Sequence, residues 1–490
     1  MYQYLLGKCI QEIINFKNLK SYMYEMKNNN RLFNRPLKKL KSINLRDSKN
    51  NELMQSKISS VPENLSQEEL SKKTSELDLI IKLYKEKKYS QTIEKINIFI
   101  KTYPNDFNAK NILGLSYKYS GNLNKAISLF QSLIAQFPRK GFLSANLGRL
   151  YYDQGKRTLA IEQYKRCITI DPSLLAAYTG LSNCYIELGQ SKDAISVLKK
   201  VLDINPKDDS ANYNLGNVYR KAGRYKEAIP YYANTDIHIS KSHQLECFYL
   251  SDDKENFYKN LKQLEEKKIL NPLAGCLSSH SSILYARKNN YSFCEKPLNY
   301  IVSKNLLKNN SLNNDFMEEV NVSLRELNLD FRNQALLKKG TQSSGNIFMS
   351  ENKIIDKLKS LILKEIKVYK ESFHKSSDGF IKSWPEKFNL YGWVVNISNG
   401  GSLDSHIHKE GWMSGSLYFS IPKKILPNDG NIAFSMTGGN YPTNGVDFEE
   451  RVVETSKGGI VLFPSSLFHR TIPFRSDEER MTIAFDVMPN

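Results

Sequence analysis

Three histidines and one arginine near the C-terminus have types and spacings that could do chemistry. His406 and His408 stand two apart, and His469 and Arg480 follow further along the chain. Side chains at positions i and i+2 of a β-strand point to the same face, so the first two histidines could bind one metal ion. A distant histidine on a neighbouring strand would complete a three-ligand face and leave other coordination positions open. The spacing therefore predicts a metal site on a sheet.

The first half of this motif offers three ligand candidates for two places. If His406 is the first ligand, His408 takes the second place and the site has three histidines. If His408 is the first ligand, Glu410 completes a His-x-Glu pair. All three residues alternate onto one face of a strand, so spacing alone does not decide between them. Arg480 is a candidate anchor for a carboxylate, because a guanidinium group can pair with both carboxylate oxygens; the alternative is a surface arginine where a strand begins.

Short runs rich in β-branched and aromatic residues predict the strands that must position these side chains. The runs are 389–397, 414–421, 431–436, 450–455, 458–463 and 480–487. An amphipathic helix is predicted at Glu351–Phe373, with its apolar stripe toward the sheet. Many short strands with one packed helix predict an α+β domain with a jelly-roll core. The Gly- and Asn-rich segments 399–413 and 437–449 are expected to be loops that could gate a pocket.

A second pattern lies upstream, where residues 75–234 repeat with a period of 34. Proline, glycine, alanine and tyrosine each recur with this step, at Pro104, Pro138, Pro172 and Pro206; Gly121, Gly155, Gly189 and Gly223; Ala126, Ala160, Ala194 and Ala228; and Tyr117, Tyr151, Tyr185 and Tyr219. This period is typical of the tetratricopeptide repeat, a helical hairpin that buries its apolar face against its neighbours. About five repeats are predicted, ending near 234 because Pro230 falls inside the last helix. Their groove could bind a peptide or partner protein, or the array could serve as a spacer.

The remaining segments carry no site chemistry. Residues 1–73 are basic, with a possible helix at 1–26 and a linker at 27–73, and residues 235–297 form a helical connector. His280, His238, His243 and His374 are expected to be packed or surface histidines.

Composition bounds the classes of function. The net charge is +19, of which +8 falls in the first 60 residues, and we interpret this as a solvated basic surface rather than a nucleic-acid arm. The six cysteines show no pairing framework and no signal peptide or membrane span is predicted, so we expect a cytoplasmic protein with reduced thiols.

Residues 298–490 resemble 2-oxoglutarate/Fe(II) oxygenase domains that follow tetratricopeptide arrays. The resemblance rests on Gly340–Phe348, Trp393–Asn396, the His406-x-His408 motif followed by Ser414–Phe419, Phe463–Ser465 with His469, and Arg480–Phe485. It implies Fe(II) held by His406, His408 and His469, since both histidines of the pair belong to the family pattern, with Glu410 as the alternative ligand. It also implies that Arg480 and Thr482 bind the co-substrate 2-oxoglutarate, with Tyr418 and Asn396 as further candidates.

The resemblance implies a dioxygenase that hydroxylates a substrate, such as a protein or peptide, recruited by the repeats. Three alternatives stay open. The domain could have lost its iron, it could hold a metal without 2-oxoglutarate, or the chain could be a non-catalytic scaffold that binds partner proteins through its repeats.

Overall fold

The structure is a computed structural model and describes residues 66–327 and 329–489. The predicted helix at 1–26 and most of the predicted linker lie outside these residues. The linker prediction is wrong at its end, because helix α3 (Gln67–Lys85) already begins there. Ser66 and Glu69 explain this start. The Ser66 Oγ accepts from the Glu69 N–H at 3.2 Å, and the Ser66 N–H donates to the Glu69 carboxylate at 2.8 Å. This reciprocal pair is a capping box.

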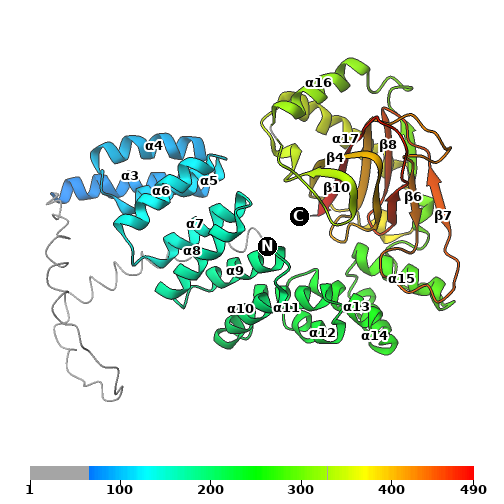
Figure 1. Cartoon of the computed structure of the whole chain (residues 1–490), viewed down its shortest axis with the longest axis horizontal. Coiled ribbons are helices and arrows are strands. Elements are labelled where there is room, and N and C mark those ends of the chain that lie inside the picture. Colours follow the sequence, from blue (N-terminus) through cyan, green and yellow to red (C-terminus); the bar gives the residue numbers. More distant parts are fainter. Residues whose placement is uncertain (1–65, 328, 490) are drawn as a thin grey trace. The chain divides into compact units, whose positions relative to one another are not determined.

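Five helical hairpins make up the repeat array (Figure 1). Each hairpin joins two consecutive helices: α3 and α4 (Tyr89–Thr102), α5 (Phe107–Tyr119) and α6 (Leu123–Gln136), α7 (Gly141–Asp153) and α8 (Arg157–Ile170), α9 (Leu175–Glu187) and α10 (Ser191–Ile204), and α11 (Asp209–Lys221) and α12 (Tyr225–Ala233). The tetratricopeptide prediction is confirmed.

The repeated residues explain the hairpin geometry. The four glycines of the repeat, Gly121 to Gly223, sit in the turns with φ between 72° and 80°, a region that costs L-residues free energy. Lys87 takes the same turn position in the first hairpin with φ 60°. The small residue of each first helix permits close packing, since a Cβ on Gly216 would lie 2.7 Å from the Tyr232 ring.

The last hairpin is shortened by Pro230, which lies inside the nine-residue helix α12 and removes one backbone N–H donor. Helical packing continues into the connector, through α13 (Ser240–Leu250), α14 (Lys254–Glu266) and α15 (Pro272–Leu284). The connector is thus joined to the repeats by direct contacts, among them an ion pair of 3.0 Å between Arg220 and Glu246.

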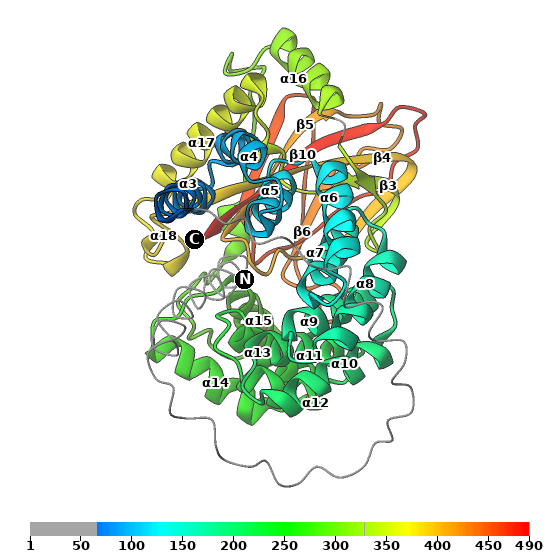
Figure 2. The ribbon, with the colours of Figure 1, turned by 90° about the vertical axis from the view of Figure 1, so that its left-hand side faces the viewer.

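The C-terminal domain is an antiparallel, nearly closed sheet (Figures 1 and 2). Its strands are β1 (Val302–Asn305), β2 (Phe331–Arg332), β3 (Leu337–Ser343), β4 (Phe388–His406), β5 (Met413–Ser420), β6 (Ile432–Ser435), β7 (Glu450–Val453), β8 (Gly459–Pro464), β9 (Phe468–Thr471) and β10 (Arg480–Pro489). The order is β1-β8-β5-β10-β4-β9-β6-β7, and β3 also pairs with β4. This confirms the jelly-roll prediction.

Helices cover the outside of this sheet: α16 (Asn314–Glu326), α17 (Lys353–Ser372) and α18 (Gly379–Lys382), with short 3-10 turns at Pro297–Tyr300 and Ile347–Met349. The predicted helix is α17, and its buried stripe of Ile355, Leu358, Ile362 and Ile366 joins one core with Leu417, Ile483 and Phe485 of the sheet.

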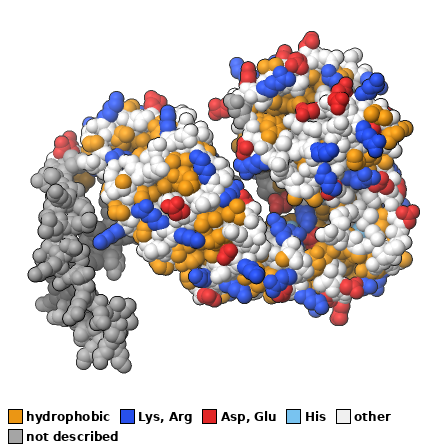
Figure 3. All heavy atoms as spheres, in the orientation of Figure 1, with side chains coloured by type: hydrophobic (Ala, Val, Ile, Leu, Met, Phe, Trp, Pro, Cys, Tyr) orange, Lys and Arg blue, Asp and Glu red, His pale blue; other side chains and the backbone are white. Residues whose placement is uncertain are grey.

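The predicted strands are all present, but β1, β2, β3 and β9 were not predicted, and β4 continues through 399–406, where a loop was expected. β9 has four residues and carries His469. None of the described helices is long and apolar enough to span a membrane. On the face seen in Figure 3, lysine and arginine side chains are interspersed with acidic and apolar ones.

Candidate metal centre

Three histidines converge at one place in the C-terminal domain. His406 ends β4 and His469 lies in β9, and the two residues are directly paired across the strands. His408 follows two residues after His406, in the segment between β4 and β5. One ring nitrogen from each of the three lies within 4.8 Å of the others, which is a spacing that one metal ion can bridge. The structure therefore brings together the three favoured ligands.

The hydrogen bonds around the rings fix which nitrogen of each ring faces the centre. Nδ1 of His406 lies 2.8 Å from the Asp404 carbonyl oxygen, and Nδ1 of His469 lies 3.2 Å from the Leu467 carbonyl oxygen. A carbonyl oxygen can only accept, so both Nδ1 atoms carry the proton and both Nε2 atoms keep a free lone pair. These are the tautomers that bind a metal through Nε2.

His408 reaches the same state through a carboxylate. Its Nδ1 lies 2.6 Å from Asp486 Oδ1, and the Ser414 hydroxyl, 3.1 Å from the same nitrogen, donates to this oxygen at 2.7 Å. The Nε2 atoms of His406 and His408 then face each other at 3.2 Å. Two lone pairs at this distance repel unless a cation lies beside them. The donor set therefore fits a bound transition metal.

The surroundings keep the imidazoles of His406 and His469 neutral, which is the form that binds metals. Burial, followed by the neighbouring His408, lowers the pKa of His406 to about 4. Burial, with the other two histidines, holds the pKa of His469 well below its usual range. Aromatic rings complete the enclosure, with Trp393 at 5.5 Å from His408 and Phe463 at 4.8 Å from His469, measured between ring centres.

Glu410, the alternative ligand, lies outside this group. Its side chain is exposed, because the chain leaves the strand after His406 and the alternation assumed for 406–410 no longer holds. Burial, and to a lesser degree the charge of Glu410, raises the pKa of Tyr213 in helix α11. The Glu410 carboxylate therefore lies near the repeats.

Arg480 begins β10 and is 3% exposed. Its Nε donates to the Gly430 carbonyl at 3.2 Å and its Nη1 donates to the Thr482 hydroxyl at 2.9 Å. Within the described residues no carboxylate pairs with it. A buried cation without a counter-charge is costly, so the site fits an anionic ligand.

Tyr418 lies directly across from Thr482, and its ring centre is 4.9 Å from the Arg480 guanidinium carbon. Its buried hydroxyl makes no hydrogen bond of regular geometry in the described part of the chain and lies close enough to Arg480 to affect its pKa. A hydroxyl beside a buried guanidinium fits a carboxylate ligand. Asn396 is different: it pairs with Met481, so alternation places it on the opposite face of the sheet from Arg480. The structure does not bring Asn396 to this site.

The sequence did not single out Asp486. Arg480, Thr482 and Asp486 have the same parity in β10, so all three side chains face the same side of the strand. Asp486 touches His408, and Arg480 stands six residues before it on the same side of β10, so their backbones are about 20 Å apart at about 3.3 Å per residue while both side chains face the same interior. The acidic residue that follows Arg480 at an even spacing was the available signal.

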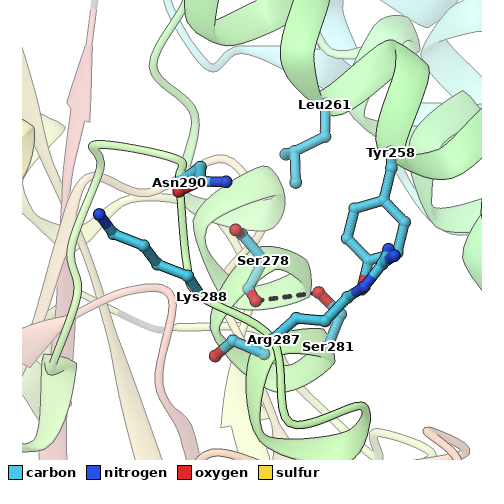
Figure 4. A pocket seen from close by; sticks show the side chains of 8 residues that line it. Tyr258, Leu261, Ser278, Ser281, Arg287, Lys288 and Asn290 are labelled. Atoms are coloured by element: carbon cyan, nitrogen blue, oxygen red, sulfur yellow. Dashed lines mark hydrogen bonds between the residues drawn. The ribbon is translucent and has the colours of Figure 1, made fainter.

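A pocket of about 220 Å³ lies elsewhere, between connector helices α14 and α15 (Figure 4). Arg287 and Lys288 line it together with several serines. The Ser281 hydroxyl donates its hydrogen bond to the Ser278 carbonyl oxygen, at 3.0 Å. The pocket contains none of the three histidines, so we place the reactive site in the jelly roll.

Comparisons with known families agree with this division of the chain. Residues 391–486 match a family model described as "Putative 2OG-Fe(II) oxygenase". Residues 112–139, 144–174 and 183–223 match three tetratricopeptide repeat models. The chain is therefore a tetratricopeptide repeat protein with a C-terminal domain of the 2OG-Fe(II) oxygenase type. The matched oxygenase segment contains all three histidines, Arg480 and Asp486.

Solved structures similar to this chain include two repeat proteins. A thermophilic repeat protein from Thermus thermophilus is 21% identical and covers 36% of this chain and 98% of its own, with a TM-score of 0.31. A repeat protein from Parabacteroides merdae is 14% identical and covers 46% of this chain and 90% of its own, with a TM-score of 0.36. No curated protein matches the chain.

Proposed function

We propose that the C-terminal domain is an iron- and 2-oxoglutarate-dependent dioxygenase that hydroxylates a protein or peptide brought by the repeats. The observation that carries this proposal is the convergence of three Nε2 lone pairs, in the same matched domain as a buried arginine that lacks a counter-ion. His406, His408 and His469 would hold Fe(II). Three imidazole ligands leave positions for a co-substrate and for O2.

When bound, Fe(II) and 2-oxoglutarate supply the oxidising chemistry, in which 2-oxoglutarate yields succinate and CO2 and a C–H bond of the substrate gains oxygen. The residues of the chain bind and orient. Arg480 and Thr482 would bind the distal carboxylate of 2-oxoglutarate, with the Tyr418 hydroxyl as a further donor. Asp486 holds the proton on Nδ1 of His408 and so keeps Nε2 aimed at the metal. The rings of Trp393 and Phe463 pack beside His408 and His469.

The repeats support a protein or peptide as the substrate. The segment after His408 lies close to the last repeat, because Lys409 bonds Glu246, which also pairs with Arg220 of α11. A chain bound along the repeats near α11 would therefore pass close to the metal ligands. We also propose that the protein works in the cytoplasm, where its buried cysteines stay reduced.

Turnover of the co-substrate tests the proposal. The full chain would be loaded with Fe(II) without oxygen, mixed with 2-oxoglutarate, and exposed to air with a pool of peptides. We expect iron at one equivalent and succinate release that depends on Fe(II) and is abolished in His469→Ala. A protein that binds neither iron nor 2-oxoglutarate would overturn the proposal. A scaffold would show partner binding through the repeats that His469→Ala leaves unchanged, with no succinate from the wild type.

A further inference from the structure

His408 differs from the other two histidines in how its backbone is held. His406 and His469 belong to strands β4 and β9 and are fixed by the sheet. His408 lies in the irregular segment between β4 and β5, where its backbone N–H donates to the Ser465 carbonyl at 3.3 Å. Asp486 holds its ring from inside the domain. No strand of the described residues pairs with the backbone of this segment, so its position also depends on contacts that its side chains make with other elements.

Lys409, the next residue, makes such a contact. Its Nζ donates to both carboxylate oxygens of Glu246, at 2.7 and 2.8 Å. Glu246 belongs to connector helix α13 and is 2% exposed. Burial alone would raise the pKa of Glu246, but Lys409 and Arg220 reverse this effect and lower it, so the carboxylate is ionised. A buried, ionised and bidentate pair is far more restrictive than an exposed one.

The same carboxylate reaches a second part of the site. The Tyr441 hydroxyl donates to Glu246 Oε1 at 3.0 Å. The Tyr441 ring packs 5.1 Å from the ring of Phe468, the residue before His469. Glu246 thus contacts Lys409, which adjoins one ligand, and Tyr441, which packs beside another. Its third partner, Arg220 of α11, lies in the last repeat.

We propose that Glu246 is a positioning residue of the metal centre: through Lys409 it fixes the segment that carries His408, so that metal affinity depends on a helix of the connector. This inference rests on the proposed metal site. It adds that the repeats and connector form part of the support of the site, in addition to recruiting a substrate.

Metal titration of the full chain tests the inference without any turnover. Co(II) is the probe, because its visible absorption reports both affinity and ligand geometry. Lys409→Met removes the ion pair between Lys409 and Glu246 and leaves the pair between Glu246 and Arg220 in place. We expect its Co(II) affinity to fall about 10- to 100-fold, the range seen for outer-shell partners of metal ligands. Lys409→Arg, which keeps a charged donor, should restore most of the affinity.

Lys338→Met is the matched control. Lys338 forms an exposed pair of 2.8 Å with Asp404, on the other side of the same histidine segment. Exposed pairs contribute little, so this variant should bind Co(II) as the wild type does. Glu246→Gln should match Lys409→Met, and the double variant should be no weaker than either single one. If Glu246→Gln does not fold, the lysine variants still decide.

Two results would overturn the inference while leaving the proposed function intact. One is wild-type Co(II) affinity and spectrum in Lys409→Met. The other is an equal loss in Lys338→Met, which would indicate a general effect of charge. A wild-type chain that binds no divalent metal would remove the proposed function and this inference together.

Discussion

His408 and Asp486 meet at 2.6 Å, between Nδ1 and Oδ1, although one lies in an irregular segment and the other in strand β10. The Ser414 hydroxyl donates to the same carboxylate oxygen. The carboxylate can only accept from the ring, so it fixes the tautomer of His408. Strand β10 thereby fixes the tautomer of His408, a candidate ligand that lies outside the strands.

Asp486→Asn should weaken the metal site. The amide keeps the shape of the side chain but accepts more weakly than a carboxylate, so His408 loses its fixed orientation. We expect metal affinity to fall about 10- to 100-fold, measured by Zn(II) competition. Asp404→Asn is the control, because only the backbone carbonyl of Asp404 touches His406. Equal affinities in Asp486→Asn and the wild type would show that this contact does not support the ligand.

Arg480→Met should abolish tight binding of 2-oxoglutarate. The variant removes the buried guanidinium, and truncating a buried charge partner costs several kcal/mol, so we expect affinity to drop roughly 100-fold. Calorimetric titration of the Mn(II)-loaded protein measures this. Mn(II) affinity itself should not change, since Arg480 contacts none of the three histidines. Retained 2-oxoglutarate binding would assign the co-substrate to another residue.

The metal-free protein should lose stability as the pH falls. The pKa of His406 is lowered to about 4 and that of His469 well below its usual range, first by burial. Below pH about 6.5 these histidines become protonated in the unfolded chain but stay neutral in the folded chain. The free energy of unfolding therefore falls as the pH drops from about 6.5 to about 4. Each such histidine contributes up to about 1.4 kcal/mol per pH unit.

Urea unfolding at pH 7, 6 and 5 measures this slope. His469→Gln should flatten it, and His374→Gln, at an exposed histidine, should not. An unchanged slope in His469→Gln would mean that this ring is not held neutral by the fold.

Lys87→Gly should stabilise the first repeat. Lys87 has φ 60° in the turn position that glycine fills in the other four hairpins. A left-handed backbone costs an L-residue about 1–2 kcal/mol. Glycine also makes the unfolded chain more flexible, and this entropy offsets part of the stabilisation. We expect up to about 1 kcal/mol, seen as slower hydrogen exchange in α3 and α4. Gly121→Ala, with φ 80° and open space around it, should have the opposite effect.

The sequence was most informative where a local rule acts. The repeats follow from proline, glycine, alanine and tyrosine, which each recur every 34 positions. Each of these prolines lies two residues after the end of a second helix, as Pro206 does after Ile204. The candidate metal ligands followed from spacing and resemblance together. Glu410 could not be separated from His408 by alternation, because alternation stops where β4 ends at His406.

Contacts between distant segments could not be predicted. Asp486 and Glu246 reach the histidine segment from β10 and α13, and no local pattern links either residue to it. Strand β9 was missed because His469 and Arg470, two of its four residues, interrupt the run of apolar and β-branched residues that predicts a strand. Its pairing with β4 and β6 makes it a strand.

Strand β4 spans both halves of the jelly roll, pairing with β10 along one half and with β9 at its end. Both partners follow it late in the sequence, whereas each repeat closes on its own neighbours. During synthesis on the ribosome the helical hairpins can therefore form early, whereas the segment with His406 and His408 has no strand partners until β9 and β10 have been made. We expect the proposed metal site to form only after β10 has been made and has paired with β4.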